Sequence, residues 1–133
     1  MPEIAMGALI ENGTVLLGRR SSGRKAYPDH WSLPGGHVED GEDAEAAMRR
    51  ELLEEIAVTP QHWQLAGRFV SEIPSEAAAT FHVYHVDRWH DVPRLVDHEH
   101  TELRWFSAAE IECETELAPP QLSEMLLKLL RRE

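Results

Sequence analysis

Three glutamates crowd one short stretch of this sequence. Glu51, Glu54 and Glu55 lie within five residues, and on a helix they would share one side, because residues three and four apart are neighbours. Like charges at that spacing destabilise an isolated helix by roughly 0.2–0.5 kcal/mol per pair. Carboxylate oxygens are also the ligands that divalent cations such as Mg²⁺ take. The cluster therefore predicts a metal-binding helix, with a solvated acidic helix as the alternative.

The neighbouring residues predict how this helix is positioned. A turn signal, Leu33-Pro34-Gly35-Gly36, precedes it, since proline fixes one backbone angle and glycine permits others. Glu42 and Asp43 place negative charge where the first turn of a helix favours it. An apolar stripe at helical spacing follows: Ala44, Met48, Leu52, Leu53 and Ile56. We expect the stripe to pack on a sheet and the carboxylates to face a cleft beside the glycines.

The segment from Gly36 to Val58 resembles the signature of the Nudix hydrolases, in their MutT-like branch. That signature is Gly, five residues, Glu, seven residues, Arg-Glu, an aliphatic, any residue, Glu-Glu, any residue, Gly and an aliphatic. The chain matches it at Gly36, Glu42, Arg50, Glu51, Leu52, Glu54, Glu55 and Val58. It departs at Ala57, where the signature has a glycine that accepts a left-handed backbone at the helix end.

The resemblance implies both a fold and a reaction. The fold is α/β, a Nudix-type α/β/α sandwich with a central mixed β-sheet, and residues 1–133 are expected to form a single domain whose Nudix box spans 36–58. The reaction is hydrolysis of a phosphoanhydride bond in a nucleoside diphosphate derivative. It depends on Mg²⁺, for which Mn²⁺ is a possible substitute.

The resemblance also assigns roles within the box. It implies that Glu51 and Glu55 are direct metal ligands and that Glu54 is a ligand or a proton acceptor. The carbonyl of Gly36 is a further candidate ligand. Arg50 is expected to pair with a neighbouring carboxylate and to fix its orientation.

A second acidic candidate lies outside the box. Glu99 precedes Trp105 by six residues, as the general-base glutamate of MutT-like chains precedes its tryptophan. A loop glutamate between two histidines could equally be solvated, and Glu102 and His98 are rivals for the role. The His-Glu-His sequence lacks the spacing of the His-Glu-x-x-His zinc motif.

Candidates for substrate contact come from other segments. Arg20 is the favoured phosphate ligand, because MutT-like chains often carry an arginine at the end of their second strand. Arg19, Arg24 and Lys25 are weaker candidates, since loop cations are also common solubilising charges. The remaining candidates for the substrate pocket are Tyr27, Leu33, Gly35, Phe81 and Gln121.

The other segments predict the elements that position these residues. Strands are expected over 4–11, 14–19, 30–33, 63–73, 80–89 and 102–106, separated by a hairpin turn at Asn12-Gly13 and loops at 20–29, 74–79 and 90–101. Apolar residues on both faces of 80–89 predict a central strand. Ser107 and Glu110 predict a capping box that starts a short helix. An amphipathic helix is expected from Pro119-Pro120 onward.

Composition narrows the classes of function. A length of 133 residues fits one core, and a net charge of −11 disfavours general nucleic-acid or membrane-surface binding. The single Cys113 excludes an internal disulfide. Apolar runs are too short for a membrane span, and the first residues lack a signal-peptide pattern. We therefore expect a cytoplasmic protein, monomer or homodimer, that acts on a small nucleotide.

The leading hypothesis is hydrolysis of a nucleoside triphosphate, with an ordinary, oxidised or otherwise modified base, to the monophosphate and pyrophosphate. One alternative is the same chemistry on ADP-ribose, a nucleotide sugar, a dinucleoside polyphosphate or capped RNA. An alternative from another class is an inactive nucleotide-binding or regulatory module. Such a module would be expected to have lost a metal ligand, yet all three glutamates are present.

Overall fold

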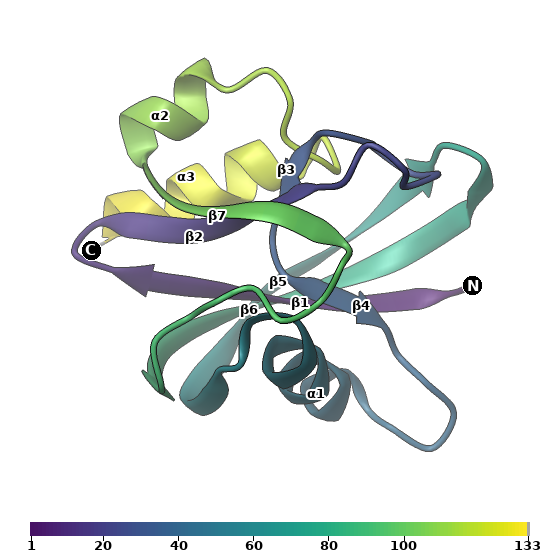
Figure 1. Cartoon of the computed structure of the whole chain (residues 1–133), viewed down its shortest axis with the longest axis horizontal. Coiled ribbons are helices and arrows are strands. Elements are labelled where there is room, and N and C mark those ends of the chain that lie inside the picture. The colour runs from purple at the N-terminus through teal and green to yellow at the C-terminus, as the bar shows by residue number, and fades with distance from the viewer. Residues whose placement is uncertain (133) are drawn as a thin grey trace.

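A mixed β-sheet runs through the middle of the molecule (Figure 1). The computed structural model describes residues 1–132, and its strands are β1 (Glu3–Glu11), β2 (Thr14–Arg20), β3 (Trp31–Ser32), β4 (Gly35–His37), β5 (Thr59–Ile73), β6 (Glu76–His90) and β7 (His100–Ser107). Strand β1 pairs in antiparallel fashion with β2 and β4, and in parallel with β6. Beyond β6 lies β5, while β3 and β7 both pair with β2. The predicted mixed sheet is confirmed, as is the central position of β6.

Helices cover both faces of this sheet (Figure 1). Helix α1 (Ala44–Ile56) lies on one face, and α2 (Ala108–Cys113) and α3 (Leu122–Arg132) lie together on the other. The arrangement is the α/β/α sandwich that the resemblance implies. None of the helices described in residues 1–132 combines the length and the apolar character that a membrane crossing requires.

Strand β1 is buried on both faces, and its side chains alternate between two apolar cores. Toward α2 and α3 it presents Ile4, Met6, Ala8 and Ile10. Toward α1 it presents Ala5 and Leu9, which pack with Met48, Leu52 and Ile56. A strand that is covered on both sides reads as a continuous apolar run. This explains why residues 4–10 show no alternation of polar and apolar side chains.

Helix α1 begins and ends with defined caps. The side chain of Asp43 accepts a hydrogen bond from the Ala46 backbone N–H at 2.8 Å. At the other end Ala57 takes the left-handed conformation, with φ 59° and ψ 33°, although its Cβ makes this unfavourable by roughly 1–2 kcal/mol. The prediction that Leu53 extends the apolar stripe is wrong, because its side chain is 55% exposed. Ala47 is buried in the core between α1 and the sheet instead.

The β5–β6 hairpin is longer than the sequence predicts. Strand β5 begins at Thr59, and β6 begins at Glu76, so the predicted loop at 74–79 shrinks to a tight turn. The turn is possible because Ser75 adopts a positive φ of 68°. The predicted Gly-Gly turn is also corrected, since Gly35 and Gly36 form β4 and pair with β1.

Two short sequence signals, a hairpin turn and a helix capping box, are confirmed. The Asn12-Gly13 hairpin joins β1 to β2, with Glu11 opposite Thr14. The capping box at α2 is complete, because Ser107 and Glu110 each accept a hydrogen bond from the other's backbone N–H. Helix α3 begins at Leu122, slightly later than predicted.

Candidate active site

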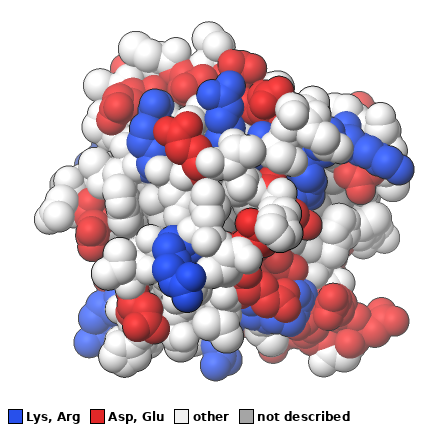
Figure 2. Space-filling view, viewed as in Figure 1, with Lys and Arg blue, Asp and Glu red and all other residues white. Residues whose placement is uncertain are grey.

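Acidic side chains gather in the region of α1, with basic side chains beside them (Figure 2). Arg50 organises them. Its Nε and Nη2 donate to the two carboxylate oxygens of Glu42, at 2.9 and 2.8 Å. Its Nη1 donates to Glu51 at 2.8 Å and to Glu54 at 3.0 Å, and Nη2 also donates to the carbonyl oxygen of His37. The guanidinium therefore fixes the direction of three carboxylates at once.

The Arg50–Glu42 pair is held in its charged form. Its hydrogen bonds to Glu42, followed by those to Glu51, raise the pKa of Arg50 well above its ordinary value. The same contacts, with a backbone hydrogen bond from Glu39, lower the pKa of Glu42 to about 2. Arg50 accordingly stays a cation throughout the physiological pH range.

Strand β4 brings the backbone against the acidic cluster. A Cβ on Gly36 would lie 2.6 Å from the Glu51 carboxyl group, and a Cβ on Gly35 would lie 2.2 Å from the carbonyl oxygen of Ala5 in the paired strand β1. Both distances are shorter than real Cβ contacts. Gly35 is therefore required by the close approach of the paired backbone, and Gly36 leaves the Glu51 carboxyl the space that it occupies.

Glu55 is the buried member of the cluster, with an exposed fraction of 2%. It faces Asp97, in the loop before β7, and His100, at the start of β7. His100 Nδ1 lies 3.6 Å from Glu55 Oε1 and 3.5 Å from Asp97 Oδ2, which is longer than an ordinary hydrogen bond. Within the described residues 1–132, both oxygens of Glu55, both of Asp97 and Nδ1 of His100 are buried without a hydrogen-bond partner. Because buried polar atoms are nearly always paired, this trio fits a bound cation.

Backbone contacts place Asp97 beside Glu55. The loop between β6 and β7 runs across the C-terminal end of α1. The backbone N–H of Val96 donates to the Glu55 carbonyl at 3.1 Å, and that of Arg94 donates to the Ile56 carbonyl at 3.0 Å. These bonds satisfy carbonyl groups that a helix end leaves without an internal partner. The next residue, Asp97, thereby reaches the carboxylate of Glu55.

Burial changes the proton affinities of this trio. It raises the pKa of the Glu55 carboxyl to about 10, with further contributions from the nearby charges of Glu51, Asp97 and Glu99. Burial also lowers the pKa of His100, in spite of the neighbouring Asp97. In the absence of a cation Glu55 is therefore protonated at neutral pH, and a divalent cation would favour its ionised form.

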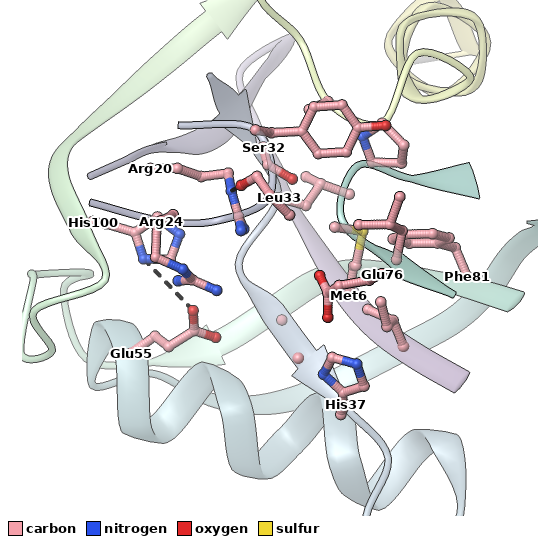
Figure 3. Close-up of a pocket in the computed structure, with 18 residues that line it drawn as sticks. Met6, Arg20, Arg24, Ser32, Leu33, His37, Glu55, Glu76, Phe81 and His100 are labelled. Carbon is pink, nitrogen blue, oxygen red and sulfur yellow. Dashed lines mark hydrogen bonds and ion pairs between the residues drawn. The ribbon is translucent and has the colours of Figure 1, made fainter. Parts of the chain in front are cut away.

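Glu55 and His100 open onto a cleft in the surface of the molecule (Figure 3). Arg20 and Arg24 lie beside them in the close-up. Burial, followed by the charge of Arg24, lowers the pKa of Arg20, and its Nε donates to the Ala26 carbonyl at 2.9 Å. This end can attract an anion. The rest of the cleft is largely apolar and is lined by Ile4, Met6, Leu33, Ile73, Phe81 and Pro119.

Many of the candidate residues from the sequence meet in this cleft. Those that line it are Arg20, Arg24, Tyr27, Leu33, Gly35, Gly36, Glu55 and Phe81. Glu51 lies against Gly36. Glu54 faces outward, with its side chain 57% exposed.

Two candidate substrate contacts lie elsewhere. Arg19 stacks over the ring of Trp31, with Cζ 5.8 Å from the ring centroid, because neighbouring strand residues point to opposite faces. Gln121 donates from Nε2 to the Val70 carbonyl at 3.2 Å and lies on a separate groove between α3 and β5. Lys25 lines a shallower depression beside the cleft together with Arg20 and Arg24.

The general-base candidates in and beside the loop before β7, which are Glu99, His98 and Glu102, have exposed side chains. Glu99 pairs with Arg24 at 3.3 Å, and its side chain is 53% exposed. His98 and Glu102 are exposed. The residues that turn toward Glu55 are Asp97 and His100, which sequence reasoning did not select. Their only signal is that they flank the loop glutamate in the Asp-His-Glu-His sequence.

Comparison with known proteins identifies the family. A model of the NUDIX domain matches residues 1–129. The chain belongs to the Nudix family. Over 130 residues it is 31% identical to the 8-oxo-dGTP diphosphatase of Escherichia coli K12, a match that covers 97% of this chain and 96% of that protein. The MutT-like assignment of this Nudix hydrolase is thus confirmed.

Two further relatives are similar in different ways. The MutT Nudix hydrolase of Burkholderia pseudomallei superposes with a TM-score of 0.84 at 24% identity, covering 96% of this chain and 95% of that one, and it supports the fold. The RNA pyrophosphohydrolase of Caulobacter vibrioides is 47% identical, but over 58 residues only, or 44% of this chain and 33% of that protein. The second likeness is therefore local.

Proposed function

We propose that this Nudix hydrolase cleaves nucleoside triphosphates to the monophosphate and pyrophosphate with Mg²⁺ as cofactor, and that one domain spanning 1–133 does so. The observation that carries the proposal is the buried, unpartnered carboxylate of Glu55 at the charged end of a cleft that also holds Arg20. The relation to the Escherichia coli 8-oxo-dGTP diphosphatase over nearly the whole chain supports the substrate class.

The residues that would hold the cation are Glu51, Glu55 and the carbonyl of Gly36, with Glu54 as a further ligand or as the proton acceptor. The unpaired oxygens of Asp97 extend this set from the facing loop. This set of oxygens, which leaves out the nitrogen of His100, suits Mg²⁺ and also admits Mn²⁺. When bound, such a cation neutralises charge on phosphate oxygens and activates water for attack.

The chain's own cations complement the phosphates. A triphosphate is an anion, and the acidic cluster alone would repel it. Arg20 and Arg24 lie on the same side of the cleft as Glu55 (Figure 3), so they can hold the phosphate chain over the carboxylates by charge-assisted hydrogen bonds. The apolar remainder of the cleft, with Leu33 and Phe81, then receives the nucleoside.

Glu54 and Glu99 are the candidates for taking the proton of the attacking water. Arg50 holds Glu54 by its Oε1 at 3.0 Å, while the side chain remains 57% exposed. Glu54 is therefore oriented and still accessible to water. Glu99 can act only after it leaves Arg24, to which it is paired at 3.3 Å. The geometry favours Glu54 for the role, with Arg50 as the residue that positions it.

The alternatives are less well supported. An RNA substrate, of which capped RNA is one kind, is suggested by a likeness that covers 33% of the RNA pyrophosphohydrolase, while the net charge of −11 opposes RNA binding. ADP-ribose, nucleotide sugars and dinucleoside polyphosphates would use the same metal and phosphate contacts. A module without activity is disfavoured because Glu51, Glu54 and Glu55 are all retained with Arg50 in place.

The test is a hydrolysis screen with product identification. Purified protein is incubated with Mg²⁺ and a panel of ribo- and deoxynucleoside triphosphates, 8-oxo-dGTP, ADP-ribose, nucleotide sugars and capped RNA, and products are separated by ion-exchange chromatography. We expect a triphosphate to yield monophosphate and pyrophosphate. Release of orthophosphate, preference for another substrate class, or no turnover on the whole panel would refute the proposal.

A further inference from the structure

The proposed function leaves the imidazole of His100 without a role. Its side chain is 4% exposed, and among the described residues its Nδ1 finds no hydrogen-bond partner. Figure 3 shows the ring turned toward Glu55, at the end of the cleft where Arg20 also lies. Because buried polar atoms are nearly always paired, this nitrogen points to a ligand that binds here.

Two features of the strands hold His100 in this position. The register between β2 and β7 shifts beside Arg20, the residue that pairs with His100, and a bulge of this kind re-aims the neighbouring side chains. A Cβ on Gly18 of β2 would lie 2.8 Å from Cδ2 of the imidazole. The glycine therefore leaves the space that the ring occupies, and the ring lies between Gly18 and Glu55.

The two carboxylates that face His100 lack compensating charge. The side chain of Glu55 is 3% exposed and that of Asp97 is 16% exposed, and both oxygens of each are without a hydrogen-bond partner within residues 1–132. Over the same residues, neither carboxylate has an ion-pair partner other than His100. Buried carboxylates are costly unless they are paired or coordinate a metal. A cation between the three side chains would satisfy these oxygens and Nδ1 together.

The distances between the three side chains fit the ligand shell of a small cation. Nδ1 of His100 lies 3.6 Å from Oε1 of Glu55 and 3.5 Å from Oδ2 of Asp97. One ligand atom from each residue lies within 4.8 Å of the other two. Two ligand atoms about 2.1 Å from a cation are about 3.4 Å apart at a tetrahedral angle and about 3.0 Å apart at a right angle. The observed spacing is nearer to the tetrahedral value.

The nitrogen ligand decides which class of cation fits. Mg²⁺ takes oxygen ligands in a nearly ideal octahedral shell, whereas an imidazole nitrogen suits transition-metal ions such as Zn²⁺. Co²⁺ and Zn²⁺ bind sets of nitrogen and oxygen ligands more tightly than Mn²⁺ does. One imidazole and two carboxylates also leave a fourth tetrahedral position open to water.

We propose that Glu55, Asp97 and His100 form a second cation site, which takes a divalent transition-metal ion in preference to Mg²⁺. Glu51, a ligand proposed for Mg²⁺, lies one helical turn before Glu55 on α1, so the two oxygens of Glu55 can serve both sites. An ion in the second site would join the C-terminal end of α1 to the start of β7 and stabilise the fold. The inference goes beyond the proposed function, because neither a nucleotide nor hydrolysis is needed to fill this site.

Co²⁺ is the probe, because its visible absorption reports both the geometry and the ligands of a site. The metal-free protein is saturated with Mg²⁺ and then titrated with Co²⁺, followed by absorption and by calorimetry. We expect the wild type to bind a single Co²⁺ with the intense absorption of a four-coordinate ion, and to melt at a higher temperature once Co²⁺ is bound. His100→Gln should weaken Co²⁺ binding by about a hundredfold and leave the Mg²⁺ affinity within about twofold.

His98→Gln is the matched control, since His98 is an exposed histidine of the same loop, and it should bind Co²⁺ as the wild type does. The Mg²⁺ affinity of each preparation shows whether His100→Gln has kept its fold. Equal Co²⁺ affinity in the wild type and His100→Gln, or displacement of Co²⁺ from the wild type by Mg²⁺, would overturn the assignment. A parallel loss of Mg²⁺ and Co²⁺ binding in His100→Gln would also overturn it, because the imidazole would then have a structural role alone. The Co²⁺ titration contains no nucleotide, so this proposal and the proposed function fail separately.

Discussion

Replacing Glu55 by glutamine should remove the pH dependence of stability that its burial creates in the metal-free protein. Glu55 is 2% exposed and faces Glu51 and Asp97. Burial first, and these charges second, raise its pKa to about 10, whereas the unfolded chain has an ordinary carboxyl with a pKa near 4.5. The folded state therefore keeps a proton that the unfolded state releases between these two values.

The sign and the size of the pH dependence of stability follow from this one proton. Because the unfolded state binds fewer protons in this window, the free energy of unfolding falls as pH rises, by about 1.4 kcal/mol per pH unit at most. His100 works in the opposite direction, since its lowered pKa makes stability rise with pH, but only below its unfolded value of 6.5. The interval from pH 7 to 9 therefore isolates Glu55 and predicts a loss of up to about 3 kcal/mol.

Urea unfolding in EDTA at several pH values measures this slope. We expect a steep decline for the wild type and a nearly flat profile for Glu55→Gln, which keeps the shape of the side chain without an ionisable group. Glu124→Gln, at an exposed position on α3, should behave as the wild type does. Saturating Mg²⁺ should stabilise the wild type more at pH 9 than at pH 7, because the cation binds the ionised carboxylate. Equal slopes for the wild type and Glu55→Gln would refute the reasoning.

Three further substitutions give separate predictions. Ala57→Gly should stabilise the protein by about 1 kcal/mol in urea unfolding, because glycine accepts the left-handed φ of 59° without a Cβ; a loss of stability would contradict the cap geometry. Gly36→Ala should weaken Mn²⁺ binding in a calorimetric titration at least tenfold, because its Cβ would meet the Glu51 carboxyl at 2.6 Å and displace it; unchanged affinity would show that the space left by Gly36 does not position a metal ligand. Arg50→Lys should lower kcat by tenfold or more with little change in KM, because an ammonium cannot replace the five hydrogen bonds that the guanidinium donates. A kcat equal to that of the wild type would show that these hydrogen bonds are dispensable.

The parts of the fold that sequence reasoning predicts are those set by neighbouring residues. The Asn12-Gly13 hairpin depends on two residues that accept a positive φ, 52° and 72° here. The Ser107–Glu110 capping box depends on side chains that bond to nearby backbone N–H groups, and both features are present. The helix that carries Glu51 follows from an apolar stripe with 3.6-residue periodicity. Such signals are complete within one short segment, which is why they can be recognised before any tertiary contact is known.

The contacts that escape prediction join distant segments. Asp97 reaches Glu55 because the backbone N–H of Val96 caps the end of α1, and this contact leaves no periodic pattern in the sequence. The choice between Arg19 and Arg20 depends on strand register, which shifts between these two residues where β2 pairs with β7. Gln121 is drawn to the Val70 carbonyl of β5, a partner 51 residues away in the sequence.

The central claim is that the α1 carboxylates hold the cation and take the proton of the attacking water when a nucleoside triphosphate is hydrolysed. Its most direct test is the rate of pyrophosphate release from the best triphosphate of the screen, measured across a Mg²⁺ titration for the wild type, Glu54→Gln and Glu124→Gln. We predict that the wild type and Glu124→Gln show the same Mg²⁺-dependent rate and that Glu54→Gln loses at least a hundredfold in kcat. A wild-type rate that persists in EDTA, or a Glu54→Gln variant with full activity, would contradict the claim.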